Sequence, residues 1–188
     1  MLAFTFIHEE LAYMRPLGHF ALAALPLTAY VVTRHHRLPS GHAILILLFA
    51  TQLPDIIDKP LAWSFGIIPS GRMLAHSLVI SGPVLLIIFG FGYYHERIGI
   101  ATIFALGYLS HLVGDFYPIL SLGTEYYFFP NLFWPLLAAN PDMNPSFVAH
   151  TPQSITGMVV PLIGFGLVCG YVIYDLAKRQ YAMQAAFR

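Results

Sequence analysis

Histidine and aspartate recur at helical spacing inside stretches of this chain that are otherwise apolar. His111 and Asp115 lie four residues apart in the segment GYLSHLVGD, and the same spacing separates Arg72 from His76. Because residues four apart share one face of a helix, each pair can act together on a ligand. A His–Asp pair can bind one metal ion, or the aspartate can orient the histidine in a purely structural hydrogen bond. An arginine beside a histidine can hold a phosphate next to such an ion, or it can anchor a helix at a membrane interface.

Two more carboxylates lie in the segment LPDIIDKP. Asp55 and Asp58 are three residues apart, which places them on one face of a helical turn, and we expect Pro54 and Pro60 to set the limits of that turn. Oxygen ligands at this spacing suit a divalent cation. A solvated loop with an aspartate capping a helix explains the segment equally well. His19, near the start of the first apolar stretch, is either a ligand or a histidine hydrogen-bonded at the interface.

The composition makes these polar residues unusual. Of the 188 residues, 57% are hydrophobic and 10% are charged, and the mean hydropathy is +0.69, whereas soluble domains carry roughly a quarter charged residues. These values exclude a soluble globular domain, a disordered chain and a typical nucleic-acid binder. Nine Lys and Arg balance nine Asp and Glu, so no net field attracts a polyanion. The single cysteine, Cys169, excludes an internal disulfide framework and a zinc site built from cysteines.

Long apolar stretches must position the polar residues. A spanning helix needs about 20 mostly apolar residues, and we expect spans near residues 17–33, 41–57, 73–94, 98–120 and 155–175. Ser70 can cap the third helix, which would place Arg72 and His76 on one helical face. The segment 126–139 is rich in aromatic residues and prolines, so we expect it to be interfacial or re-entrant. The sequence therefore predicts an all-α polytopic membrane helix bundle, with residues 1–188 as a single domain.

Basic residues indicate how the chain is oriented, because they favour the cytoplasmic side of a membrane. With five spans, one side carries six of them: Arg34, Arg37, Arg97, Lys178, Arg179 and Arg188. The other side carries three: Arg15, Lys59 and Arg72. We therefore expect the protein in the plasma or inner membrane, with its N-terminus outside and its C-terminus in the cytoplasm.

The same arrangement places the polar residues of four spans at one depth on the outer side. Asp115 lies in the outer half of the fourth span, and His111 is one turn deeper, about 6 Å further in. A one- or two-metal site at this depth accounts for them all. Its candidate ligands are His19, Asp55, Asp58, His76, His111 and Asp115, with Arg72 beside them. His150 can reach the same site from the segment 121–154, whereas a solvated loop explains four histidines on the opposite side: His35, His36, His42 and His95.

The order of these motifs resembles a known family. A histidine followed by LPDxxDK, RxxxHS and GYLSHxxxD, within roughly residues 17–120, resembles the small membrane-bound metal-dependent hydrolases of the YdjM type, especially their archaeal branch. The resemblance implies metal ligands among the six His and Asp residues just named, with Arg72 near the substrate. Many relatives carry a histidine directly before the arginine and an aspartate pair one residue closer. Here Gly71 takes the first position and Ile56-Ile57 separates the aspartates, so one potential ligand of the family is missing.

The YdjM-type proteins are in turn similar to helical zinc-dependent enzymes of the phospholipase C and single-strand nuclease type, which implies phosphoester hydrolysis. We therefore expect a membrane-embedded metal-dependent hydrolase, with Zn²⁺ as the ion because imidazole ligands favour it. A bound ion would activate water, a carboxylate such as Asp58 or Asp115 would accept its proton, and Arg72 would neutralise charge on the phosphoryl oxygens. A site at headgroup depth indicates a lipid or lipid-linked phosphoester as substrate and no nucleic-acid partner.

Two other classes of function fit the same residues. Intramembrane His and Asp also form the relays of metal-ion or proton transporters, although the inner halves of the third and fourth spans offer only Thr102 to continue such a path. A catalytically inactive interaction or regulatory protein would instead bind a partner through the segment 121–154. The aromatic residues of that segment form an apolar surface, which interfacial anchoring also explains: Phe128, Phe129, Phe133 and Trp134.

Overall fold

Helices make up the regular structure of the chain wherever the structure describes it. The computed structural model describes residues 16–147 and 155–186, so His150 lies outside the described residues. The elements are α2 (Pro16–His35), α3 (Gly41–Lys59), the π-helix η1 (Pro60–Ser64), α4 (Leu78–Tyr94), α5 (Ile98–Phe116), α6 (Ile119–Leu122), the 3₁₀ turns η2 (Gly123–Glu125) and η3 (Pro130–Phe133), and α7 (Ile155–Ala186). The prediction of an all-α fold is confirmed.

Several of these helices have the length and composition of membrane spans. The stretches Pro16–His35, Ile98–Phe116 and Pro161–Ala185 are long and apolar enough to cross a bilayer, and the apolar helix Leu78–Tyr94 is shorter. A helix suits this environment because all its backbone hydrogen bonds are internal. The prediction of a membrane helix bundle is confirmed, and the count of five spans stays a prediction.

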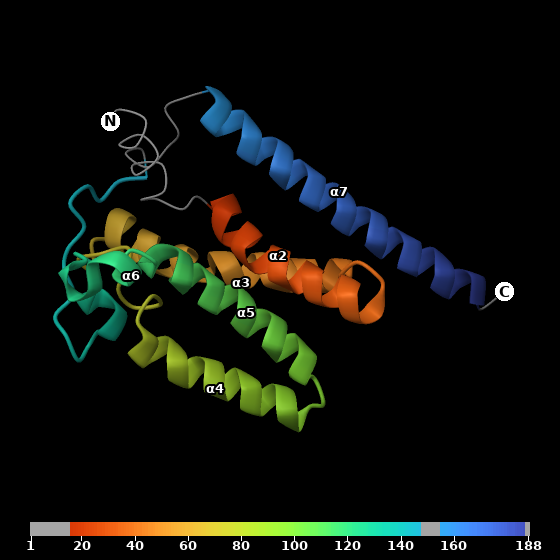
Figure 1. Cartoon of the computed structure of the whole chain (residues 1–188), viewed down its shortest axis with the longest axis horizontal. Helices are drawn as coiled ribbons and strands as arrows, with labels where there is room; N and C mark the ends of the chain where they lie inside the picture. The colour runs from red at the N-terminus through yellow and green to blue at the C-terminus, as the bar shows by residue number, and fades with distance from the viewer. Residues whose placement is uncertain (1–15, 148–154, 187–188) are drawn as a thin grey trace.

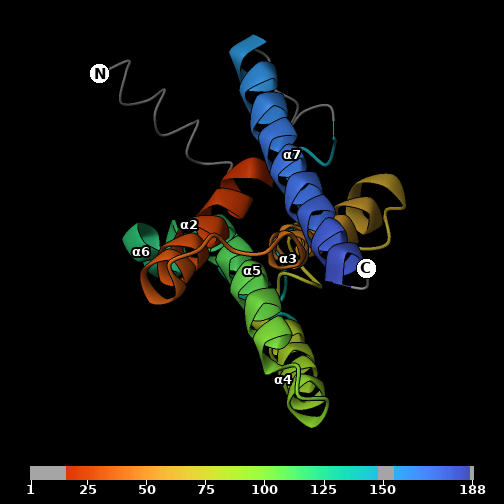
Figure 2. The ribbon, with the colours of Figure 1, turned by 90° about the vertical axis from the view of Figure 1, so that its right-hand side faces the viewer.

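Helices α3 and α5 form the centre of the bundle. Helix α3 contacts α2, α5 and α7, and α5 also contacts α2 and α4. Figure 1 shows α4 and α5 as a hairpin on one side of the bundle, with the long α7 on the other, and Figure 2 shows α7 crossing beside α3. The α2–α3 and α4–α5 connections and the C-terminal end of α7 lie at one end of the bundle, and α6 lies at the other (Figure 1).

Helices α3 and α5 approach closely because position 107 has no side chain. A Cβ atom on Gly107 would lie 2.9 Å from the Cβ of Ala50 and 3.0 Å from the carbonyl oxygen of Leu47. We expect Gly107→Ala to lower the free energy of unfolding by about 1–3 kcal/mol, because the helices must move apart. Thermal unfolding in detergent measures this loss. Gly99→Ala on the same helix is the control, because a Cβ there meets no atom within 4 Å; equal stability of the two variants would contradict the prediction.

The third expected span is shorter than predicted, and Ser70 does not cap it. Helix α4 begins at Leu78, and the Ser77 hydroxyl accepts the capping hydrogen bond from the backbone N–H of Val79. The residues before it form an irregular connection between η1 and α4, so Arg72 and His76 do not share a helical face. The physical reason is that the carboxylate of Asp58 accepts backbone N–H groups of this connection, which competes with helix formation.

The limits predicted for the turn with the two aspartates are also wrong. Pro54 lies inside α3, and the chain continues helically through Pro60 into η1. As their spacing predicts, Asp55 and Asp58 do lie in helical turns, the last ones of α3. The aromatic segment 126–139 contains only the short turn η3 as regular structure, which agrees with an interfacial or re-entrant piece.

Candidate metal centre

The polar residues singled out in the sequence meet where α3 and α5 end. They come from the start of α2, the end of α3, the η1–α4 connection and the end of α5, and ion pairs and hydrogen bonds link them into one cluster: His19, Asp55, Asp58, Arg72, His76, His111 and Asp115. Six of the seven are less than 9% exposed, and the side chain of Asp55 is 11% exposed. So dense a buried group of ionisable residues needs a specific compensating partner for each charge.

Four of these residues point one ligand atom each at a common volume. Those atoms of Asp55, His76, His111 and Asp115 all lie within 4.8 Å of one another. The Nε2 atoms of His76 and His111 are 3.1 Å apart, and Asp55 Oδ1 is 3.6 Å from each of them. Asp115 Oδ2 is 3.3 Å from Nε2 of His76 and 3.8 Å from Nε2 of His111.

Asp58 orients His76 from the opposite edge of the ring. Its Oδ2 atom lies 2.8 Å from His76 Nδ1, which fixes the imidazole so that Nε2 faces the centre. The same carboxylate accepts the backbone N–H groups of Met73, Ala75 and His76 at 2.8 to 3.2 Å. Both oxygens of Asp58 are therefore engaged in holding the η1–α4 connection and the His76 ring.

His111 is oriented in the same way by a backbone carbonyl. Its Nδ1 donates to the carbonyl oxygen of Thr51 at 2.6 Å, which leaves the lone pair of Nε2 directed at His76. Two imidazole lone pairs and two carboxylates this close together repel one another unless a positive charge lies between them. That charge is either a proton or a metal ion.

The donor set fits a divalent metal ion. With Zn–N bonds of about 2.0–2.1 Å, two tetrahedral ligand atoms lie roughly 3.3 Å apart, close to the 3.1 to 3.8 Å found here. Asp55 Oδ1 has no hydrogen-bond partner within the described residues, although it is buried. Its other oxygen pairs with Lys59 at the surface of the site. An orphaned carboxylate oxygen aimed at two imidazoles is what a cation site requires.

Without a metal, the carboxylates hold a proton on His76. Burial lowers the pKa of His76, but the close carboxylates of Asp115, Asp55 and Asp58 outweigh burial and raise the pKa to about 10. Ligand atoms must lose their protons before they can bind a metal, so a metal ion that bound here would displace a proton from the site.

His19 lies against the other side of the centre. Its Nε2 is 3.3 Å from Asp115 Oδ1, and its ring stacks on that of His111 with the centroids 4.0 Å apart. His19 Nδ1 is buried and, within the described residues, has no hydrogen-bond partner. His19 therefore contacts Asp115 through the oxygen that faces away from the two central imidazoles.

Arg72 closes the cluster from the η1–α4 connection. Its Nε donates to Asp115 Oδ2 at 2.7 Å, and its guanidinium lies over the ring of Phe128, 5.2 Å from the centroid. Burial lowers the pKa of Arg72, but the charge and hydrogen bond of Asp115 outweigh it and raise the pKa further. Arg72 therefore stays charged, and its guanidinium lies beside the ligand atoms.

Sequence reasoning missed the residue that holds the aromatic segment in place. Asp142 accepts hydrogen bonds from Trp63 Nε1, from the Ser70 hydroxyl and from the backbone N–H of Gly71 at 2.6 to 2.9 Å. Asn131 donates to the same Ser70 hydroxyl. The sequence feature that could have drawn attention to Asp142 is that it is one of two charged residues in the segment 121–154.

The fold and the centre together define a class: an all-helical membrane protein with a buried His/Asp cluster that can hold a metal ion. The chain belongs to the YdjM inner membrane protein family, whose family model matches residues 14–186. No curated protein and no solved structure matches the chain.

Proposed function

We propose that this protein is a metal-dependent phosphoester hydrolase. The observation that carries the proposal is the convergence of two imidazole Nε2 atoms and two carboxylates beside a buried, charged arginine. A divalent ion bound there supplies a Lewis acid and an activated water. Mixed imidazole and carboxylate ligands favour Zn²⁺ among the common ions. The ligands we propose are Asp55, His76, His111 and Asp115, with His19 as an additional one.

The remaining residues act through position and charge. Asp58 holds the His76 ring and the connection that carries Arg72, so we propose it as a positioning residue in place of a ligand or base. Arg72 is placed to bind the phosphoryl oxygens of a substrate next to Asp115. The proton of an attacking water would fall to Asp115 Oδ1, the oxygen that does not face the two central imidazoles, or to His19 where it is not a ligand.

A lipid or lipid-linked phosphoester is the substrate class that we propose. The centre lies at the ends of α3 and α5 and not midway along them, which in a membrane corresponds to headgroup depth (Figure 1). The aromatic segment, held over this end by Asp142, supplies Phe128 against Arg72. Aromatic side chains of this kind favour the membrane interface.

We propose that the end opposite the centre is cytoplasmic. The α2–α3 and α4–α5 connections and the end of α7 share that end, and they carry the basic residues Arg34, Arg37, Arg97, Lys178 and Arg179. By the positive-inside rule the centre then opens to the outside. A cysteine introduced at Arg97 is expected to react with a membrane-impermeant maleimide only after the cells are opened, and labelling of intact cells would reverse the orientation.

Hydrolysis by the purified protein tests the proposal, with phosphatidic acid as a monoester and phosphatidylglycerol as a diester. Zn²⁺ is expected to support turnover, and a chelator is expected to abolish it. Arg72→Lys should lower kcat by about a hundredfold with metal content unchanged, because lysine keeps the charge but loses the planar fork. Arg97→Lys at the opposite end is the control. Metal-loaded protein that hydrolyses neither ester would contradict the proposal, and full activity of Arg72→Lys would remove the arginine from it.

A further inference from the structure

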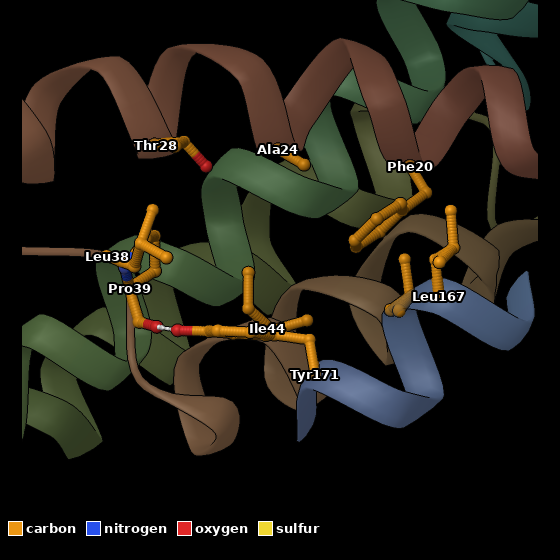
Figure 3. A pocket seen from close by; sticks show the side chains of 9 residues that line it. Phe20, Ala24, Thr28, Leu38, Pro39, Ile44, Leu167 and Tyr171 are labelled. Carbon is orange, nitrogen blue, oxygen red and sulfur yellow. Dashed lines mark hydrogen bonds between the residues drawn. The ribbon is translucent and has the colours of Figure 1, made fainter. Parts of the chain in front are cut away.

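A second feature, away from the metal centre, is an apolar groove between α2, α3 and α7. It has a volume of about 280 Å³ and is lined by residues that include Phe20, Ala24, Leu38, Ile44, Leu167 and Tyr171. Figure 3 shows these side chains projecting from α2, α3, α7 and the α2–α3 connection into the space between them. The volume is near the lower end of the range of small-molecule sites, roughly 300–1,000 Å³. It suits one slender apolar group.

Two close contacts of α7 with its neighbours lie on either side of the groove. At one end, a Cβ on Gly164 would lie 2.5 Å from Leu17 Cδ2, so α7 and α2 touch there. At the other end, the Tyr171 hydroxyl donates to the carbonyl oxygen of Pro39, and Asp175 accepts the backbone N–H of Gly41 at 2.8 Å. A gap between helices in a bilayer is filled by lipid, because an empty one forfeits packing on every wall.

One end of the groove lies near two exposed arginines. Leu38 and Pro39 line the groove in the α2–α3 connection; Arg37 directly precedes Leu38, and Arg34 lies in the last turn of α2. Both arginines lie in an exposed stretch and, within the part of the chain that the structure describes, form no ion pair with an acidic residue. The nearby carboxylate of Asp175 is already shared between Gly41 and Arg179.

We propose that this groove binds one acyl chain of an anionic phospholipid whose phosphate lies at Arg34 and Arg37. The lining is mostly apolar: its polar side chains are Thr28 and Tyr171, and the Tyr171 hydroxyl already donates to Pro39. Such a lining favours a hydrocarbon chain over water, which needs several polar partners. The positive charges of Arg34 and Arg37 select an anionic headgroup over a zwitterionic one. Helix α2 is itself a candidate span, so the groove lies alongside bilayer lipid. The proposal does not depend on the hydrolase activity, because the groove shares no residue with the metal centre.

Native mass spectrometry of the full chain tests this proposal after exchange into equal amounts of phosphatidylglycerol and phosphatidylcholine. The wild-type protein is expected to retain one phosphatidylglycerol. Ala24→Trp, which fills the groove, should lower the fraction of protein with a retained lipid at least fivefold. Ala29→Trp, on the exposed face of the same helix, should leave that fraction unchanged. Arg34→Gln with Arg37→Gln should keep a bound lipid but lower the preference for phosphatidylglycerol roughly tenfold or more, and Arg97→Gln should leave it unchanged.

Two results would overturn the proposal. In the first, Ala24→Trp and the double arginine variant retain lipid with the stoichiometry and the phosphatidylglycerol preference of the wild type. The bound lipid would then be annular lipid and not lipid in the groove. In the second, the wild-type protein carries no lipid and forms a dimer that Ala24→Trp dissociates, which would assign the groove to a second copy of the chain. Helical circular dichroism and metal content, measured on every variant, show that each one is folded.

Discussion

Replacement of His111 by alanine is expected to abolish stoichiometric metal binding and to lower the affinity for Zn²⁺ by at least about a hundredfold. The loss of a residue that merely orients a ligand costs roughly ten- to a hundredfold in affinity, and the loss of a ligand costs more. His111 directs Nε2 at the centre because Thr51 accepts the hydrogen bond of its Nδ1. Alanine leaves the carboxylates of Asp55 and Asp115 facing only one imidazole. Titration calorimetry and metal analysis after dialysis measure the change.

Matched variants make this result specific to the centre. His76→Ala is expected to behave like His111→Ala, since the two Nε2 atoms are 3.1 Å apart and face the same volume. His42→Ala is the control, because His42 is exposed at the start of α3, at the opposite end of that helix. If the His76 and His111 variants both keep one tightly bound ion per chain, the ion lies elsewhere and the centre is wrongly assigned.

Much of the centre can be predicted from the sequence, because a membrane makes polar residues conspicuous. An ionisable side chain inside a long apolar stretch is costly unless it has a partner, so His111 and Asp115 stand out without any structural information. Their spacing of four residues within α5 then places both at one end of the helix, where Asp115 Oδ2 and His111 Nε2 are 3.8 Å apart. The same reasoning finds Asp55, because the last turn of α3 is continuous with an apolar helix.

The connection between η1 and α4 cannot be predicted in this way. Local pattern favours a helix from about residue 71, since the following residues are mostly apolar. The hydrogen bonds that prevent it come from Asp58, which lies 15 to 18 residues earlier in the chain. Sequence spacing reports contacts within one helix, and it carries no information about a carboxylate that binds the backbone of another segment.

The surroundings of Gly71 can be explained locally from the structure. The resemblance described in the sequence analysis leads us to expect a histidine at this position, where the chain has glycine. A Cβ at this position would lie 3.1 Å from the ring of Trp63, and the backbone N–H donates to Asp142. Trp63 also donates to Asp142, so indole, glycine and carboxylate form one contact. Trp63 and Asp142 thus occupy the surroundings of position 71, and a side chain there would have to displace them.

The roles of the two aspartates in LPDIIDKP differ more than their spacing suggests. Asp55 Oδ1 has no hydrogen-bond donor within the described residues, and its other oxygen pairs with Lys59, which is partly exposed. Asp58 is fully buried and accepts N–H groups on both oxygens. One carboxylate is therefore free to bind a cation, and the other is already committed to the fold.

Asp58→Asn is therefore expected to lower the free energy of unfolding by about 3 kcal/mol or more. An amide cannot accept every N–H group that the carboxylate accepts. Each buried donor that is left unsatisfied costs about 1–3 kcal/mol. Asp55→Asn, the matched variant, should lose much less stability without metal, since Asp55 Oδ1 accepts no hydrogen bond within the described residues and only the partly buried pair with Lys59 is weakened. It should nevertheless lose metal affinity by at least about tenfold. Thermal unfolding of the metal-free proteins and Zn²⁺ titration separate the two effects. The reverse outcome, with a stable Asp58→Asn that loses its metal and an unstable Asp55→Asn that keeps it, would make Asp58 the ligand and Asp55 the residue that holds the fold.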